Sequence, residues 1–273
     1  MKKELFKILF LNLFFLTGCI KPIKPETIII DGGNASSKSN LLNKVALICN
    51  LTKVDPKSYD GWDGDCPGTD IDANIIVSMC KIYNIPYVKL ENEKCTSKNV
   101  IKEWNNCISQ LNPTNGLFIF FYSGHGGQVY TTDTNEKDGL DETLCFWDGQ
   151  FIDDNVWKLI NTIPKTARCF MLTDCCNSGS NYRLPFNLKK SRSKLSARGI
   201  EPNLLHIGGC NDGEYSYGSS RGGTLSTTMK LTFNKNITYI EWFNKTKSAM
   251  KNSKQIPTFA ETGKSFKNSK IFE

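Results

Sequence analysis

The chain has 273 residues, 39% of them hydrophobic, with 34 Lys and Arg against 27 Asp and Glu, which gives a net charge of +7. This hydrophobic share excludes a fully disordered chain, and the modest positive charge gives no reason to expect a nucleic-acid partner. Eleven cysteines are present, and we expect most of them to be buried, inert thiols, while the sequence does not say which of them, if any, form disulfides.

The first residues have the pattern of an export signal. Residues 1–18 begin with three Lys and one Glu, continue with an apolar run over 8–16 and end in small residues. The run is shorter than the roughly 20 residues that a membrane span needs. The tetrapeptide Leu-Thr-Gly-Cys that ends at Cys19 resembles a bacterial lipobox. This resemblance implies a lipid on Cys19 and a protein of the bacterial cell envelope, anchored to a membrane and facing outside the cytoplasm. An ordinary signal peptide and an uncleaved anchor are the alternatives.

A flexible tether is predicted between this signal and a folded domain. Residues 19–42 contain Pro22, Pro25, a Gly-Gly-Asn turn and a Ser-rich stretch, without a sustained periodic apolar face. Such a composition does not bury enough apolar surface to order itself. Residues 43–273 have the length of one sizeable domain.

Strand-like apolar runs alternate with segments of helical periodicity through that domain. The strands are predicted at 45–51, 87–90, 117–122, 169–172, 203–207 and 256–260. The helices are predicted from Asp70 or Asp72 to 83, over 98–111, over 153–163, near 224–233 and over 239–250. This order predicts an α/β fold, with a mostly parallel six-stranded sheet flanked by helices on both faces.

Two of these strands end in turns that carry reactive side chains. His125 follows the strand over 117–122, and Cys176 follows the strand over 169–172. Open parallel sheets place reacting groups outside the carboxyl ends of their strands. We therefore expect a thiol nucleophile with an imidazole base, in which the neighbouring imidazole lowers the thiol pKa from about 8.5 towards neutrality. The other histidine, His206, lies inside a predicted strand, and a packed core role is expected for it.

The residues around this pair resemble the motifs of a known family. Residues 122–126 read Tyr-Ser-Gly-His-Gly, and residues 174–179 read Asp-Cys-Cys-Asn-Ser-Gly. Both resemble metacaspases, which are caspase-like cysteine peptidases, except that Asn177 stands where the family usually has His. Further matches in the same order are Asp141-Glu142, Ile152-Asp153-Asp154, Gly209-Cys210, Gly222-Gly223-Thr224 and Gln255-Ile256-Pro257. The resemblance, which covers roughly residues 44 to 260, implies a caspase-like fold and an endopeptidase with a Cys-His dyad that needs no cofactor for its chemistry.

The resemblance also implies how a substrate is held. Asp72, Ser123 and Asp174 match family residues that line an acidic pocket, so peptide or protein substrates with Arg or Lys before the cut are expected. The spacing from Cys66 to Asp72 is longer than in the usual family pattern, which makes Asp174 the firmer of the two assignments. The backbone N–H groups of Gly126 and Cys176 match the groups that stabilise the oxyanion.

Calcium binding and self-cleavage are two further expectations. Asp141, Asp153 and Asp154 match three calcium-ligand positions of the family, but a fourth family carboxylate falls near Arg183, where a cation disfavours a metal. The sequence therefore leaves calcium dependence open, and the alternative is that Asp153 and Asp154 complement the dipole at the N-terminus of a helix. The loop over 183–198 is rich in Lys and Arg and has no acid. This loop therefore contains sites at which an Arg- or Lys-specific peptidase would cut its own chain.

The sequence leaves three other interpretations open. One is a catalytically inactive caspase-like binding domain, tethered at the cell surface. Another is a peptidase of the same structural class, such as a clostripain-like or separase-like enzyme, with a different pocket. The third is a metal-binding or adhesive lipoprotein in which Cys176 has no catalytic role.

Overall fold

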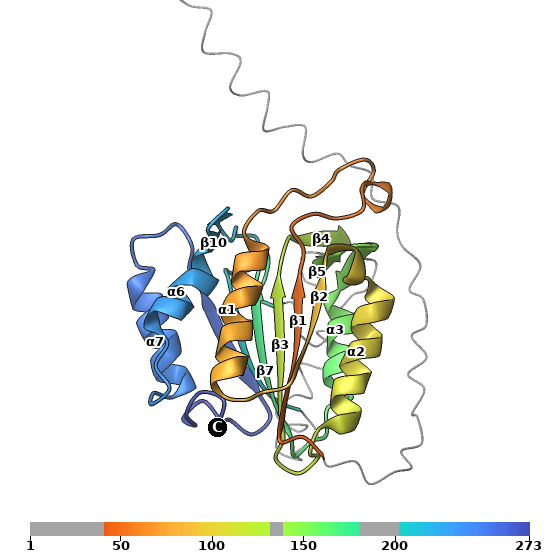
Figure 1. Ribbon diagram of the computed structural model, residues 1–273. Coiled ribbons are helices and arrows are strands. Elements are labelled where there is room, and N and C mark those ends of the chain that lie inside the picture. Colours follow the sequence, from red (N-terminus) through yellow and green to blue (C-terminus); the bar gives the residue numbers. More distant parts are fainter. Residues whose placement is uncertain (1–40, 132–138, 181–201) are drawn as a thin grey trace, which may run out of the picture.

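The computed structural model describes residues 41–131, 139–180 and 202–273 (Figure 1). Its main sheet has six strands in the order β11-β8-β7-β3-β1-β2. The strands are β1 (Lys44–Asn50), β2 (Tyr87–Glu91), β3 (Leu117–Ser123), β7 (Arg168–Asp174), β8 (Asn203–Gly208) and β11 (Thr258–Thr262). All neighbours pair in parallel except β11, which is antiparallel to β8. The predicted six-stranded, mostly parallel sheet is confirmed.

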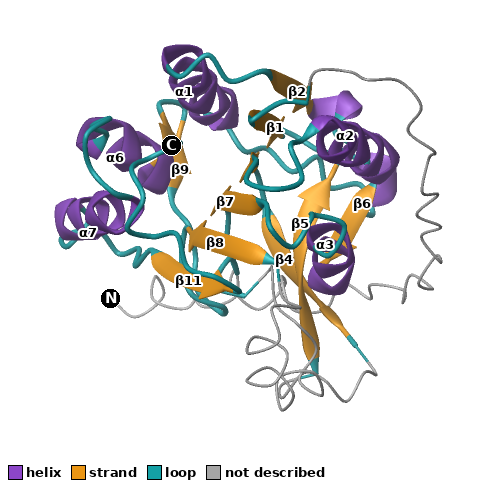
Figure 2. Cartoon of the chain, turned by 90° about the horizontal axis from the view of Figure 1, so that it is seen from below, coloured by secondary structure: helices purple, strands orange, loops and turns teal. Residues whose placement is uncertain are grey.

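Helices cover both faces of this sheet (Figure 2). One face packs against α1 (Thr69–Ile82), α6 (Thr224–Thr232) and α7 (Tyr239–Ala249), and the other packs against α2 (Ser97–Gln110) and α3 (Asp153–Ile160). Every residue of β3 is buried as a result. Because both faces are covered, the central strands read as continuous apolar runs.

The structure contains two small antiparallel sheets that the apolar pattern does not predict. The strands β4 (Gly126–Tyr130), β5 (Leu140–Phe146) and β6 (Gly149–Ile152) form the first, and β9 (Gly218–Ser219) and β10 (Gly222–Gly223) form the second. Glycine and charged residues interrupt the alternation in these short segments. The first of the two sheets is stabilised by strand pairing and by Leu144, Phe146 and Phe151 of β5 and β6, which are buried in the main core.

The start of α1 differs from the expectation that Asp70 or Asp72 caps it. The N-cap is Gly68, which has a φ of 93° and provides no side-chain cap. A Cβ at Gly68 would overlap the carbonyl oxygen of Ser219 in β9, so glycine permits both the left-handed backbone and the close approach of the two segments. Asp70 and Asp72 instead lie in the first turn of α1, where a negative charge favours the helix dipole.

Register explains why two turns far apart in the sequence meet. Asn50 of β1, Ser123 of β3 and Asp174 of β7 are consecutive partners across the sheet. Since the strands are parallel, their carboxyl ends share one edge, where β4, β10 and the segment after β1 also lie (top of Figure 1). His125 and Cys176 each follow their strand's last paired residue by two positions, so they leave the sheet side by side.

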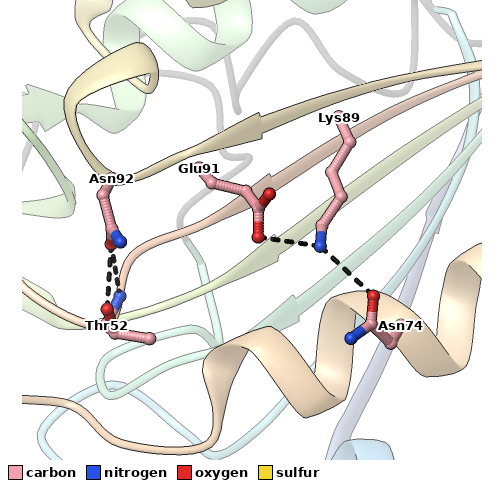
Figure 3. A network of polar contacts seen from close by, with 5 residues as sticks. All are labelled: Thr52, Asn74, Lys89, Glu91 and Asn92. Atoms are coloured by element: carbon pink, nitrogen blue, oxygen red, sulfur yellow. Dashed lines mark hydrogen bonds and ion pairs between the residues drawn. The ribbon is translucent and has the colours of Figure 1, made fainter.

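The segment between β1 and α1 is fixed to the end of β2 (Figure 3). Asn92 Oδ1 accepts hydrogen bonds from the backbone N–H of Thr52 at 2.9 Å and from its hydroxyl at 3.0 Å. The carbonyl of Thr52 in turn accepts from the N–H of Cys66 at 2.8 Å. A neighbouring network joins Lys89 to Glu91 and Asn74. The segment that crosses the sheet edge is therefore held at both of its ends.

His206 and most of the described cysteines occupy buried positions. His206 is fully buried in β8, and its Nε2 lies 2.8 Å from the Thr173 hydroxyl, which confirms its packed role. All ten cysteines of the described ranges are free thiols, and eight of them are buried, as expected for most. No helix in the described ranges is long and apolar enough to cross a membrane. The predicted signal, almost all of the tether, Cys19 and the 183–198 loop lie outside the described residues.

Candidate active site

His125 and Cys176 line one small cavity at the carboxyl edge of the sheet. The cavity has a volume of about 120 Å³, and Asp72, Ser123 and Asp174 line it as well. The structure thus brings together the proposed nucleophile, its base and the three proposed pocket residues. They come from the ends of β3 and β7 and from the first turn of α1.

The turn that carries His125 is held by the small sheet. The carbonyl of His125 accepts hydrogen bonds from the Tyr122 hydroxyl at 2.7 Å and from the N–H of Cys145 in β5 at 3.1 Å. The imidazole packs against Trp62, with ring centroids 4.7 Å apart. Its Nε2 lies 3.3 Å from the carbonyl oxygen of Asp65. The backbone and the ring of His125 are therefore both fixed by neighbours.

The Asp65 carbonyl determines which tautomer His125 adopts. A carbonyl oxygen only accepts, so Nε2 must carry the proton in this contact, and the lone pair of the neutral ring then lies on Nδ1. An imidazole with a free Nδ1 lone pair can accept a proton from a thiol. The side chain of Asp65 is exposed, and it is the backbone carbonyl of this residue that contacts the imidazole.

Cys176 is held by the segment before β9. The N–H of Ser216 donates to Cys176 Sγ at 3.4 Å. A Cβ at Gly126 would overlap the carbonyl oxygen of Cys176, so the glycine allows the two proposed oxyanion residues to lie in contact. Asn177 adopts a left-handed conformation, with a φ of 50°, and its Oδ1 accepts from the N–H of Gly213 at 2.9 Å. Asn tolerates this backbone well, so its departure from the family motif leaves the nucleophile in place.

The protonation state of the dyad differs from the expectation. Burial raises the pKa of the Cys176 thiol, although the hydrogen bond from Ser216 opposes this rise. Burial also lowers the pKa of His125, against the opposing effect of the carbonyls of Asp65 and Gly64. Both shifts disfavour the charged forms, because charged groups lose hydration when they are buried. The resting pair is a neutral thiol beside a neutral imidazole, and the expected lowering of the thiol pKa is wrong for the free protein.

The neutral pair predicts how fast Cys176 is alkylated at different pH values. Only the thiolate reacts with iodoacetamide, so the rate is expected to keep rising up to and beyond pH 9. The rate is followed by mass spectrometry of the peptide that contains Cys176. Cys66 in the same cavity is the internal comparison: burial, followed by the charge of Asp174, raises its pKa to about 12, so it should react far more slowly. A rate that levels off near pH 7 would show an ion pair and contradict this account.

The first carboxylate of the pocket is Asp174. Its Oδ1 accepts from the Ser216 hydroxyl at 2.7 Å. Its Oδ2 accepts from the backbone N–H of Ser226 at 2.9 Å and from the Ser226 hydroxyl at 2.8 Å. A Cβ at Gly223 would overlap Oδ2 of Asp174. The short β10 strand and the first turn of α6 therefore fix the orientation of this side chain.

Asp72 is the second carboxylate, and it also lies close to Gly223. Its Oδ2 accepts from the Ser123 hydroxyl and its Oδ1 from the N–H of Gly223, both at 2.8 Å. Burial, followed by the charge of Asp174, raises the pKa of Asp72 to about 7. Burial also raises the pKa of Asp174, and three hydrogen bonds oppose the rise. In the described part of the chain, neither carboxylate forms an ion pair with Lys or Arg.

The Thr69 hydroxyl is a further polar group of this acidic pocket, and it was not predicted. The hydroxyl of Thr69 is buried, lines the cavity and has no hydrogen-bond partner among the described residues. Buried polar atoms normally have partners, so this hydroxyl is available to a ligand. The sequence offered no signal for it, because a Thr at the start of a helix is common.

The raised pKa of Asp72 has a consequence for stability. Its folded pKa of about 7 exceeds the ordinary value of 3.8, so the folded state holds the proton more tightly and its stability falls as pH rises between these values. Asp72→Asn removes this dependence. The free energy of unfolding of the variant, relative to the natural protein, is expected to rise by roughly 1 kcal/mol per pH unit between pH 4 and 7. Urea unfolding at pH 5 and pH 7 measures the difference, and the same difference at both pH values would contradict the shift.

The proposed calcium ligands do not form a metal site in this structure. No group of three or more His, Cys, Asp or Glu side chains could hold a metal ion in the described ranges. Asp153 and Asp154 begin α3, and the carboxylate of Asp153 accepts from the N–H of Asp154 at 2.9 Å. Asp141 lies on β5, opposite Val129. The alternative role at a helix N-terminus fits Asp153 and Asp154 better than shared calcium ligation with Asp141 does.

The fold and the cavity together define a class of protein: an α/β protein with a thiol and an imidazole at the carboxyl edge of a mostly parallel sheet. Residues 43–266 match the family model described as the caspase domain, and the chain belongs to that family. Its curated relatives include Metacaspase-1 of Schizosaccharomyces pombe, 36% identical over 121 residues, which is 42% of this chain and 27% of that protein. Metacaspase-1 of Arabidopsis thaliana is 29% identical over 132 residues, 42% of this chain and 36% of that protein. The chain thus matches about a third of the length of these relatives or less.

Two solved structures resemble the fold over most of its length. A crystal structure of a protein from Geobacter sulfurreducens has a TM-score of 0.68 at 25% identity, covering 81% of this chain and 94% of that chain. Caspase-1 from Spodoptera frugiperda has a TM-score of 0.55 at 13% identity, covering 82% of this chain and 88% of that chain, and it bears on the fold alone. The caspase-like α/β architecture expected from the sequence is confirmed.

Proposed function

We propose that this chain is a cysteine endopeptidase that hydrolyses peptide bonds after Arg or Lys. The observation that carries the proposal is one cavity in which Cys176 and His125 lie beside two buried carboxylates that have no described cationic partner. Membership of the caspase domain family supports the same chemistry.

The reaction begins from the neutral dyad. The Nδ1 lone pair of His125 accepts the proton of Cys176 as Sγ attacks the carbonyl carbon of the substrate. The backbone N–H groups of Gly126 and Cys176 stabilise the oxyanion that forms. The imidazolium then donates its proton to the leaving amine, and an acyl-enzyme remains on Sγ. A water molecule, activated by the same imidazole, hydrolyses this thioester and restores the thiol.

The acidic pocket selects the residue before the cut. Asp72 and Asp174 are each oriented by hydrogen bonds that leave accepting capacity on their oxygens, and the Thr69 hydroxyl adds a further acceptor. A guanidinium or ammonium group would supply the positive charge that this buried pair lacks. Asp72 is half protonated near pH 7 in the free protein, so activity on Arg peptides is expected to weaken as pH falls below 7.

The direct test is turnover of short fluorogenic peptides that differ only in the residue before the cut. A soluble protein beginning after Ser39 is compared with its Cys176→Ala variant. Cleavage after Arg or Lys that disappears in the variant supports the proposal, and cleavage after other residues only would remove the pocket assignment. No cleavage, together with an unmodified Cys176 after treatment with a thiol reagent, would favour an inactive binding domain tethered at the cell surface.

Self-processing within residues 183–198 is a further part of the proposal. It is supported by the basic composition of this loop and by its position shortly after Cys176. The purified protein is expected to give two fragments on incubation, while a variant with every Lys and Arg of the loop changed to Ala remains intact. Identical cleavage of both proteins would refute self-processing at these sites.

Calcium stimulation is supported by the family resemblance alone, since the described residues provide no ligand group. Peptide turnover is measured with calcium and with a chelator, for the natural protein and for Asp141→Asn. If calcium raises the turnover of the natural protein but not that of Asp141→Asn, ligation at Asp141 is supported. Equal turnover in all four conditions would refute calcium stimulation.

The lipid anchor at Cys19 is supported by the signal and lipobox pattern of the first 19 residues. The full chain, expressed in a bacterium, is expected to partition into the detergent phase and to incorporate a labelled fatty acid. Cys19→Ala should abolish both. Labelled lipid on the Cys19→Ala protein would contradict this site.

A further inference from the structure

A buried glutamine links the end of the sheet to the segment that holds Cys176. Gln255 is 2% exposed and lies in the segment between α7 and β11. Its Nε2 donates to the carbonyl of Gly209 at 2.8 Å and to the Ser216 hydroxyl at 2.9 Å. Its Oε1 accepts from the N–H of Tyr217 at 2.9 Å. Both hydrogens and the oxygen of the amide are therefore used.

Gly209 provides a rigid attachment point for this amide. It directly follows β8, and its N–H donates to the carbonyl of Thr173 in β7 at 2.9 Å. A Cβ at Gly209 would lie 2.7 Å from the Ser216 hydroxyl, so the two segments are in close contact. The Gln255 amide thus joins the segment before β9 to the same edge of the sheet from which Cys176 emerges.

Ser216, which the Gln255 amide holds, contacts both the nucleophile and the acidic pocket. Its backbone N–H donates to Cys176 Sγ at 3.4 Å, and its hydroxyl donates to Asp174 Oδ1 at 2.7 Å. One residue therefore contacts the nucleophile through its backbone and the pocket carboxylate through its side chain. Movement of the Ser216–Tyr217 segment would disturb both contacts together.

We propose that Gln255 is a positioning residue of the active site, whose amide holds Ser216 and Tyr217 so that the Cys176 thiol and the Asp174 carboxylate are oriented together. The partners explain why an amide is needed. The Tyr217 N–H requires an acceptor, while the Gly209 carbonyl requires a donor, and only a side chain with both groups satisfies them. A carboxylate at this position would satisfy Tyr217 alone and would add a charge near Asp174.

The first test uses alkylation of Cys176, which does not depend on peptidase activity. Gln255→Met keeps the length of the side chain and removes all three hydrogen bonds. Loss of the Ser216 N–H contact at Sγ is expected to shift the pH profile of iodoacetamide alkylation upwards and to slow the reaction about tenfold at pH 7.5. Thr246→Val is the matched control, because Thr246 is equally buried and hydrogen-bonded but lies on α7, outside the cavity. Identical profiles for the natural protein and folded Gln255→Met would overturn the proposal.

The second test rests on the proposed peptidase function and uses an Arg peptide. Gln255→Met is expected to lower kcat and raise KM, with a combined loss of 10- to 100-fold in kcat/KM, because nucleophile and pocket are both disturbed. A purely structural role would reduce the fraction of active protein and leave KM unchanged. Gln255→Glu should recover relative to the natural protein as pH falls from 8 to 5.5, since its protonated carboxyl regains a donor, and a pH-independent ratio would count against the proposal. If the natural protein cleaves nothing, the peptidase proposal fails, while the alkylation profiles still decide the role of Gln255.

Discussion

Replacing Cys176 by Ala is expected to lower kcat/KM for an Arg peptide by a factor on the order of 10⁴ or more. The reason is that the covalent route disappears entirely: no other described thiol has the same combination of partial exposure, a place in the cavity and an N–H donor at its sulfur. Cys66 also lines the cavity, but its pKa of about 12 makes it a poor nucleophile at neutral pH. Initial rates with the purified proteins measure the effect.

The control for this loss is Cys107→Ala. Cys107 is a buried free thiol on α2, on the sheet face opposite α1, and its removal is expected to leave kcat/KM within about twofold of the natural value. His125→Ala should show a loss similar to that of Cys176→Ala, because the two side chains act as one unit. Substantial turnover by the Cys176→Ala protein would show that a different group attacks the peptide.

Asp174→Asn is expected to lower kcat/KM for an Arg peptide by about 10²- to 10³-fold, as removal of one partner from a buried charge pair typically does. Asn keeps the shape of the side chain and can still accept from the N–H of Ser226, but it carries no charge to meet the guanidinium. The loss should be confined to charged substrates. The natural protein should therefore prefer an Arg peptide over the same peptide with citrulline, and the variant should lose this preference.

Asp63→Asn provides the matched charge control for this experiment. Asp63 lies on the segment before α1, and it is exposed to solvent outside the cavity. Its substitution changes the net charge equally and should leave the preference for Arg over citrulline intact. If both variants lose the preference for Arg over citrulline, the overall charge of the protein is responsible. If Asp174→Asn keeps the preference, Asp174 does not bind the Arg side chain.

The main sheet could be predicted because its central strands are covered on both faces. β3 and β7 each contain a continuous apolar run that is followed by polar residues, so the sequence marks where these strands end. The β4 and β5 strands could not be predicted in this way. Gly126 and Gly127 begin β4, while Asp141 and Glu142 lie within β5, and these residues resemble a loop. The pairing of these strands with each other and the contacts that hold them are visible only in the folded chain.

In the candidate site, too, some features could be predicted from the sequence and others could not. His125 and Cys176 could be found because side chains carry their chemistry, and the register of β3 with β7 explains why a spacing of 51 residues brings them together. The partner of the imidazole could not be found, because it is the backbone carbonyl of Asp65, and every residue has such a carbonyl. The predicted protonation state of Cys176 was also wrong. A neighbouring His suggests a lowered thiol pKa, but burial of both groups acts in the opposite direction, and burial is a property of the fold.

The measurement that tests the central claim most directly is the labelling of this protein by a short peptide that ends in Arg and carries a thiol-reactive acyloxymethyl ketone. Mass spectrometry then identifies which cysteine is modified. We expect modification at Cys176 alone, a marked loss of it in His125→Ala and in Asp174→Asn, and slower labelling when citrulline replaces Arg. Labelling that is distributed over several cysteines, or that is equally fast with citrulline, would contradict an acidic pocket beside a single nucleophile.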